Sequence, residues 1–247
     1  MSNFRIILQY EGTRYQGWQR QESTENTIQG KLEALLSKMC GEPVEVQASG
    51  RTDAGVHALG QVANFHCNTD RGCREVMEYM NRYLPEDIGV ISVEKVPERF
   101  HSRLNAKGKT YRYRVMTGNI PHVFERRYVY EHPEALDLEA MRAAAALLCG
   151  THDFKAFTSA KKGKKSTVRS LRTILIEQEG DEIIFTYTGD GFLYHMVRIL
   201  TGTLLEAGEG KRSLQDVKTA LKSGKRENAG VLVPAKGLTL VKVYYES

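Results

Sequence analysis

The sequence has no uninterrupted apolar run that approaches 18 residues, and its first residues show no basic segment followed by a long apolar one. Such runs mark membrane spans and secretion signals, so we expect neither. Cysteine is scarce and never has the CxxC spacing: the 247 residues contain Cys40, Cys67, Cys73 and Cys149. Without an export signal, we expect four reduced thiols in a soluble, cytoplasmic protein.

Patterns that hold metals or nucleotides are also missing. The residues His57, His66, Cys67 and Cys73 have a spacing that fits no common zinc site. The acid cluster of a metal-dependent nuclease and a glycine-rich phosphate loop are both absent from the motifs described below. The composition, 41% apolar and 26% charged, is that of an ordinary globular protein.

Acidic residues are absent from two long stretches, 99–124 and 154–176. Positive residues fill them: Arg99, Arg103, Lys107, Lys109, Arg112 and Arg114 in the first, and Lys155, Lys161, Lys162, Lys164, Lys165, Arg169 and Arg172 in the second. Aromatic residues alternate with these charges, so the pattern favours a polyanion that also offers rings for stacking, as RNA does. Charge runs are also typical of solvated loops and exposed strands.

Hydrophobic periodicity predicts two similar halves. In the first we expect strands at 4–10, 44–48, 61–65 and 88–96 and helices at 27–40 and 74–82, which is the β-α-β-β-α-β order of a ferredoxin-like (RRM-like) fold. In the second we expect strands at 109–116, 127–130, 171–177, 182–187 and 238–244, and helices at 138–149, 192–207 and 214–223. Asp137 and Gly150 are typical caps of the helix between them, and residues 179–181 predict a hairpin turn. We therefore predict an α+β protein whose halves join into one long, mostly antiparallel sheet, with helices on one face and a central cleft.

One arginine stands in an apolar segment, 192–205 (FLYHMVRILTGTLL). A helix that is apolar around most of its circumference is largely buried, and a buried arginine needs a partner. Arg198 therefore either reaches solvent or pairs with a carboxylate, for which Asp53 is a candidate. Asp53 lies in the tight segment 48–58 (ASGRTDAGVHA), where it either bonds to the backbone of its own turn or acts as a nucleophile.

The segment 49–65 (SGRTDAGVHALGQVANF) resembles the signature loop of the tRNA pseudouridine synthase A family. Further matching segments follow nearly the whole chain: 10–21 (YEGTRYQGWQRQ), 97–115 (PERFHSRLNAKGKTYRYRV), 190–208 (DGFLYHMVRILTGTLLEAG) and 234–245 (PAKGLTLVKVYY). The resemblance implies the pseudouridine synthase fold, an internal isomerisation of uridine, and no cofactor or metal.

The resemblance also assigns roles to residues. Asp53 corresponds to the catalytic aspartate that attacks a flipped-out uridine, Tyr111 to the active-site tyrosine, and Arg198 to the basic partner of the aspartate. Leu238 corresponds to an apolar contact of the base, and Arg51 and Arg103 to arginines that engage the RNA backbone. Residues 1–105 would then carry the aspartate loop and residues 106–247 the tyrosine and arginine, in one catalytic unit.

The expected substrate is the tRNA anticodon stem-loop, with uridines 38, 39 and 40 as targets and a homodimer as the acting form. In the second basic stretch, the expected RNA contacts are Lys161, Lys162, Lys164, Lys165 and Arg169. Two departures from the family pattern bear on substrate range: the lysine-rich segment 158–169, and the bulky pair Leu232 and Val233 before Pro234. Rival readings are a non-catalytic tRNA-binding protein or RNA chaperone, a paralogue with a different RNA target, and a base glycosylase.

Overall fold

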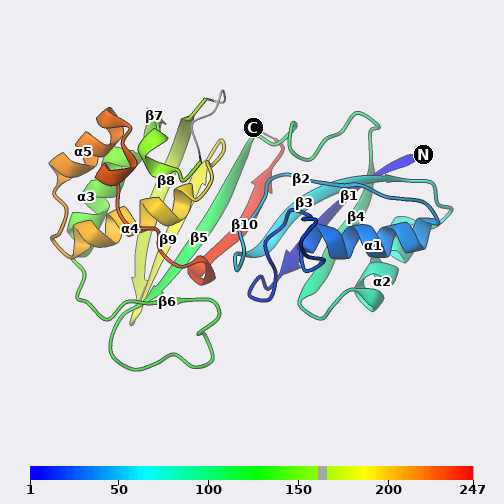
Figure 1. The fold of residues 1–247 in the computed structure, drawn as a ribbon, viewed down its shortest axis with the longest axis horizontal. Helices are drawn as coiled ribbons and strands as arrows, with labels where there is room; N and C mark the ends of the chain where they lie inside the picture. The colour runs from blue at the N-terminus through cyan, green and yellow to red at the C-terminus, as the bar shows by residue number, and fades with distance from the viewer. Residues whose placement is uncertain (161–165, 247) are drawn as a thin grey trace. The chain divides into compact units, whose positions relative to one another are not determined.

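The computed structural model describes residues 1–160 and 166–246. They form ten strands and five α-helices, which confirms the α+β class (Figure 1). The chain divides into two compact units. The N-terminal unit comprises residues 1–107 together with the chain from Thr239 onward, and the C-terminal unit comprises residues 108–238.

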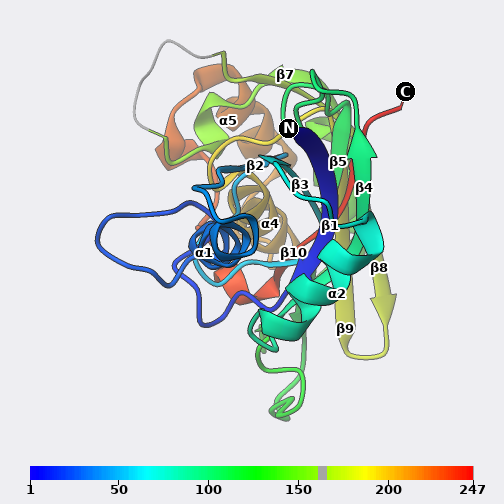
Figure 2. The same ribbon diagram turned by 90° about the vertical axis from the view of Figure 1, so that its right-hand side faces the viewer.

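The N-terminal unit has the predicted β-α-β-β-α-β order. Its elements are β1 (Ser2–Tyr10), α1 (Ile28–Cys40), β2 (Val46–Ala48), β3 (His57–Cys67), α2 (Cys73–Tyr83) and β4 (Ile88–Val96). In its sheet β1 lies between β4 and β3 and is antiparallel to both, and β2 pairs with β3. The last strand, β10 (Leu238–Tyr244), pairs in parallel with β3 at His57 and Ala58. The helices α1 and α2 pack next to each other against this sheet (Figure 2).

Local chemistry explains these elements. Phe4, Ile6 and Leu8 alternate along β1 and are fully buried, and each such side chain contributes about 1.5–3 kcal/mol of burial free energy. Thr27 caps α1 by accepting a hydrogen bond from the Gly30 N–H, at 3.1 Å. Gly41 ends the helix with a φ of 72°, in the left-handed region that glycine occupies without strain.

The C-terminal unit contains β5 (Gly108–Met116), β6 (Tyr130–Glu131), α3 (Leu138–Leu148), β7 (Gly150–Asp153), β8 (Val168–Glu179), β9 (Glu182–Gly189), α4 (Met196–Gly208) and α5 (Leu214–Ser223). Its antiparallel sheet has the order β5-β9-β8-β7, and β6 pairs in parallel with β5. The helices α3, α4 and α5 pack together in Figure 1, and α3 also packs on β8. Asp137 caps α3 as predicted, by accepting hydrogen bonds from two main-chain N–H groups.

The helix that carries Arg198 begins later than its sequence predicts. Residues 192–195 form a loop, because the Tyr194 carbonyl accepts hydrogen bonds from Thr158 and Ser159 and because His195 takes a left-handed φ of 63°. Arg198 thus lies in the first turn of α4 and is half-buried, rather than in the middle of a buried helix.

Two cysteines correct the expectation of four free thiols. Cys40 at the end of α1 and Cys67 at the end of β3 form a disulfide, with their Cα atoms 6.4 Å apart. No local pattern predicts this pairing, because the two cysteines are 27 positions apart in sequence and meet only where the helix and strand end side by side. Cys73 and Cys149 are free thiols, as predicted. No helix within residues 1–160 and 166–246 is long and apolar enough to cross a membrane.

Candidate active site

Asp53 lies on the loop that connects β2 to β3. The main-chain carbonyl of Asp53 accepts a hydrogen bond from the Val56 N–H at 3.1 Å, which closes a tight turn. Gly55 occupies the third position of this turn with a φ of 77°, which a side chain would strain. The carbonyl of Asp53 thus closes the turn, and its carboxylate is half-buried.

The N-terminal segment that follows β1 packs directly on this loop. The Trp18 N–H donates a hydrogen bond to the Thr52 carbonyl at 2.9 Å. A Cβ atom on Gly17 would lie 2.8 Å from the same carbonyl oxygen, and one on Gly12 would lie 2.0 Å from the Val56 carbonyl oxygen. Both positions therefore require glycine, and the backbone on either side of Asp53 is fixed by backbone contact.

Buried hydroxyl and amide groups hold the loop on its other side. The hydroxyls of Tyr10 and Thr52 lie 2.7 Å apart, and Gln61 donates to the Gly50 carbonyl at 2.9 Å. Ser49 in turn donates its hydroxyl proton to the side-chain oxygen of Gln61 at 2.8 Å. Burial raises the pKa of Tyr10 to about 12, so its hydroxyl stays neutral and hydrogen-bonded at physiological pH.

His57 follows the loop as the first residue of β3 and is buried. Its Nδ1 lies 3.5 Å from a carboxylate oxygen of Glu11, but the same nitrogen accepts a hydrogen bond from the Gly12 N–H at 3.0 Å. A nitrogen that accepts a hydrogen bond carries no proton, so we assign Nδ1 as an acceptor and the Glu11 contact as no ion pair. His57 thereby holds Gly12 against the aspartate loop.

Tyr111 lies on β5 in the C-terminal unit. It is 7% exposed, and its ring meets Phe192 edge to face with a centroid separation of 5.1 Å. Tyr113, two residues along the same face of the strand, is fully buried and donates its hydroxyl proton to the Pro234 carbonyl at 2.7 Å. Burial also raises the pKa of Tyr113 well above its ordinary value.

Arg198 holds the segment that leads to Leu238. Its Nε donates to the Val233 carbonyl at 2.7 Å, one residue before the carbonyl that Tyr113 holds. A Cβ atom on Gly237 would lie 2.7 Å from the Tyr113 ring, so the segment also lies flat on that ring. The result is a fixed approach to Leu238, which is buried.

The two bulky residues before Pro234, Leu232 and Val233, have different surroundings in this segment. Val233 is buried and offers its carbonyl to Arg198, whereas Leu232 is 37% exposed. Of these two residues, Leu232 is therefore the one whose side chain is available to a bound molecule.

The expected RNA contacts differ in their surroundings. Arg51 and Arg103 are exposed on loops of the N-terminal unit. Arg169 donates to the carbonyls of Ser166 and Val168 at the start of β8. Lys161, Lys162, Lys164 and Lys165 lie outside the described residues. Arg114, part of the first basic stretch, instead pairs with Glu125 and Glu182 and serves the structure of its own unit.

Sequence reasoning missed the residues that support the site. The sequence patterns predicted no role for Gly12, Gly17, Tyr10 or Tyr113. Two glycines within the short motif 10–21 were nevertheless a signal that backbone segments approach closely there. Asp53, Arg51 and Arg103 lie in the N-terminal unit, whereas Tyr111, Arg198 and Leu238 lie in the C-terminal unit.

Known proteins provide an independent comparison. The family model described as tRNA pseudouridine synthase matches residues 6–105 and 144–246, which include Asp53, Arg198 and Leu238 but not Tyr111. A tRNA pseudouridine synthase A of Bacillus sp. (strain KSM-64) is 48% identical over 97% of this chain and 98% of its own length. A tRNA pseudouridine synthase A 1 of Clostridium tetani is 46% identical over 99% of this chain and 100% of its own length. The chain therefore belongs to the tRNA pseudouridine synthase family.

Proposed function

We propose that this protein isomerises uridine to pseudouridine at positions 38, 39 and 40 of the tRNA anticodon stem-loop. As a tRNA pseudouridine synthase it is an isomerase that acts on uridine in tRNA. The similarity to synthases of type A over nearly the whole of both chains carries the proposal. The three positions follow from the resemblance of the loop at residues 49–65.

Asp53 is the proposed nucleophile. A carboxylate is a nucleophile in its ionised form and then needs no activating base. In the reaction the Asp53 carboxylate forms a bond either to C1′ of the ribose or to the uracil ring, the glycosidic bond between C1′ and N1 breaks, and the uracil turns while it is held; the bond to Asp53 breaks again before the product leaves. A new bond then joins C1′ to C5, the C5 hydrogen leaves as a proton, and N1 gains a proton. The close-packed backbone around Asp53 supports this role, because it fixes the position from which the carboxylate attacks.

Arg198 is the proposed partner of Asp53. It stands in the first turn of α4, where the helix dipole already presents positive charge. The N-terminal end of a helix favours an anion, so a carboxylate that approached there would meet both the dipole and the arginine cation, whose Nε is held by the Val233 carbonyl. An arginine so oriented would stabilise the aspartate as an anion and keep it aimed at the base.

Tyr111 and Leu238 are the proposed contacts of the uracil ring. The Phe192 ring restricts Tyr111, so stacking on the base costs little additional side-chain entropy. Unstacking a base costs a few kcal/mol, and stacking on an aromatic ring returns about 1–3 kcal/mol. Arg51 and Arg103 are exposed and would supply phosphate contacts that offset the rest, together with the positive residues from 161 to 169.

We further propose that the protein acts as a cytoplasmic homodimer. Exposed apolar side chains in the loop between β5 and β6 support a second protein copy there: Ile120 is 79% exposed and Phe124 is 94% exposed. Sedimentation at micromolar concentration tests this part, since Phe124→Ser in a real interface would shift the protein toward monomer.

The decisive experiment uses unmodified tRNA transcript with tritium at C5 of uracil. We expect the wild type to release tritium to water without free uracil, and Asp53→Ala to release none while it still binds tRNA. Circular dichroism of the variant controls for folding. Mapping the product positions then tests the assignment to uridines 38, 39 and 40.

The rival functions give different results in the same assay. A tRNA-binding protein or RNA chaperone would bind and release no tritium from any tRNA. A base glycosylase would release free uracil. A paralogue with another RNA target would be active on other transcripts and leave the anticodon stem-loop unmodified.

A further inference from the structure

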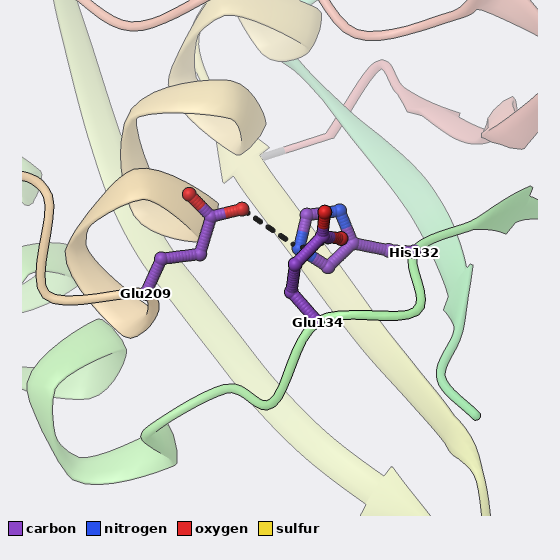
Figure 3. Close-up of side chains that lie close together, drawn as sticks. All are labelled: His132, Glu134 and Glu209. Atoms are coloured by element: carbon purple, nitrogen blue, oxygen red, sulfur yellow. Dashed lines mark ion pairs between the residues drawn. The ribbon is translucent and has the colours of Figure 1, made fainter. Parts of the chain in front are cut away.

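Three side chains with oxygen and nitrogen donors meet in the C-terminal unit, at the far end of α4 from Arg198. His132 follows β6, Glu134 lies two residues later, and Glu209 caps the C-terminus of α4. Eleven residues of helix at 1.5 Å each separate Arg198 from Glu209 by about 16 Å, so this cluster is no part of the proposed catalytic machinery. Figure 3 shows both carboxylates directed toward the imidazole of His132.

The donor atoms are close enough to share one ligand. Nε2 of His132 lies 2.9 Å from Oε1 of Glu209 and 3.5 Å from Oε2 of Glu134. One donor atom from each of the three residues lies within 4.8 Å of the others. With bonds of about 2.1 Å to a central ion, separations of 2.9 and 3.5 Å correspond to angles of about 90° and 110°. These angles span octahedral and tetrahedral coordination.

His132 has a buried nitrogen without a satisfactory hydrogen bond. The side chain is 7% exposed, and Nε2 has no hydrogen-bond partner although Glu209 lies within ion-pair distance. Nε2 therefore lies close to a carboxylate oxygen without forming a hydrogen bond to it. A buried polar atom left in this way costs about 1–3 kcal/mol, and an ion bound to Nε2 would remove the cost.

The surrounding charge also favours a cation. The C-terminus of α4 carries the negative end of the helix dipole, and Glu209 and Glu134 add two carboxylates to it. Lys211 binds the other oxygen of Glu209 at 2.7 Å and leaves Oε1 directed at His132. A second contact of this kind orients a metal-binding carboxylate rather than replacing the metal.

Access from solvent is open on one side. A pocket of about 290 Å³ is lined by Pro133, Glu134, Ala135 and Leu136 together with residues of β8 and β9 and the turn between them. Glu134 is half exposed and lies between this pocket and His132. An ion can therefore reach the cluster without unfolding of the unit.

We propose that His132, Glu134 and Glu209 bind one divalent transition-metal ion of the zinc class. One imidazole and two carboxylates suit zinc, and the same ligands suit cobalt as its spectroscopic substitute, whereas calcium and magnesium require oxygen ligands alone. The ion ties the end of α4 to the segment that enters α3. It stabilises the C-terminal unit and takes no part in the isomerisation.

Metal titration of the untagged full chain, after treatment with EDTA, tests the site. We expect one equivalent of Zn²⁺ by calorimetry, a d–d absorption band with Co²⁺, no comparable binding of Mg²⁺ or Ca²⁺, and a rise in Tm of at least about 3 °C with saturating Zn²⁺. Glu134→Gln and Glu209→Gln should each weaken Zn²⁺ binding at least tenfold. Glu134 is half exposed, so its variant should fold normally even if the Glu209 variant does not.

A second histidine–glutamate pair provides the matched control. His66 Nε2 lies 3.2 Å from Glu98 in the N-terminal unit, without a third ligand nearby among the described residues. His66→Gln should leave Zn²⁺ affinity and the cobalt band unchanged. The proposal fails if the wild type binds no Zn²⁺, if Glu134→Gln binds as tightly as the wild type, if His66→Gln abolishes binding, or if Ca²⁺ binds as tightly as Zn²⁺.

Discussion

The two units hold their candidate site residues in different ways. In the N-terminal unit Asp53 stands on a loop, whose position depends on glycines that allow backbone contact and on buried hydroxyl groups. In the C-terminal unit Tyr111 and Arg198 stand on β5 and α4, whose own hydrogen bonds fix them. There the additional contacts fix the segment before Leu238 instead. A residue on a loop thus depends on many neighbouring contacts for its position. A residue on a helix or strand does not, so nearby side chains can fix other segments, such as the one before Leu238.

Gly12→Ala should break the N-terminal arrangement most severely. Its Cβ would lie 2.0 Å from the Val56 carbonyl oxygen, so the aspartate loop must move. We expect a loss of about 3 kcal/mol in the free energy of unfolding and an approximately hundredfold loss of isomerisation rate. Urea denaturation and tritium release measure the two effects.

Gly72→Ala is the control for this substitution. Gly72 has an ordinary φ of −71°, and a Cβ there would approach nothing closer than 3.5 Å. Its stability and rate should stay near those of the wild type. Equal behaviour of the two variants would contradict the idea that backbone contact holds the loop.

Reduction of the Cys40–Cys67 disulfide should weaken the N-terminal unit without changing its loop. Closing 27 residues of chain stabilises the fold by about 3–4 kcal/mol in the chain-entropy description. We expect dithiothreitol to lower the free energy of unfolding by this amount and to leave the isomerisation rate at 25 °C unchanged. Cys40→Ser should match the reduced wild type and respond no further to dithiothreitol. If dithiothreitol lowered the stability of Cys40→Ser as well, the loss of stability would come from a group other than this disulfide.

Tyr113→Phe and Tyr245→Phe compare the same bond in the two units. Each tyrosine donates to a backbone carbonyl at 2.7 Å, that of Pro234 for Tyr113 and that of Ser102 for Tyr245. Both variants should lose about 1–2 kcal/mol of stability, because a carbonyl is left unsatisfied. Steady-state kinetics should show a changed KM or kcat for Tyr113→Phe alone, since of these two tyrosine bonds only that of Tyr113 helps to fix the approach to Leu238. Equal kinetic effects would remove that distinction.

Alkaline pH should release the contact between Tyr10 and Thr52. The folded-state pKa of Tyr10, about 12, is above the unfolded value near 10, so its contribution to stability is complete below pH 10 and is lost as the pH rises toward 12. Between pH 10 and 11.5, urea denaturation should show that the free energy of unfolding falls more steeply with pH for the wild type than for Tyr10→Phe. The difference in slope should correspond to the release of at most about one additional proton on unfolding. Identical slopes would show that Tyr10 ionises as easily in the folded protein.

Local signals in the sequence predicted a large part of the fold. The helix predicted at 27–40 corresponds to α1 (Ile28–Cys40), and the hairpin turn predicted at residues 179–181 lies between β8 and β9, where Gly180 has a φ of 60°. The segment around Asp53 stood out by its glycines and its single carboxylate, whereas the role of Asp53 followed only from the family resemblance and stays a prediction. In each case neighbours in sequence supply the chemistry, so the pattern contains the information.

Features that depend on distant residues were not predicted. The short strand β7 has the sequence GTHD, which lacks alternation and forms because β8 pairs with it. The late start of α4 depends on bonds from Thr158 and Ser159. The disulfide and the cluster of His132 with Glu209 likewise join elements far apart in the chain, so no local pattern reveals them.

The pairing of β10 with β3 has a consequence for the order of folding. Thr239 pairs with His57, 182 residues earlier, so the N-terminal unit lacks a strand until residue 239 and its successors have been synthesised. The C-terminal unit is continuous in sequence and has all its residues sooner. On the ribosome the C-terminal unit can therefore become complete first, while the edge of β3 beside the aspartate loop waits for the last strand to arrive.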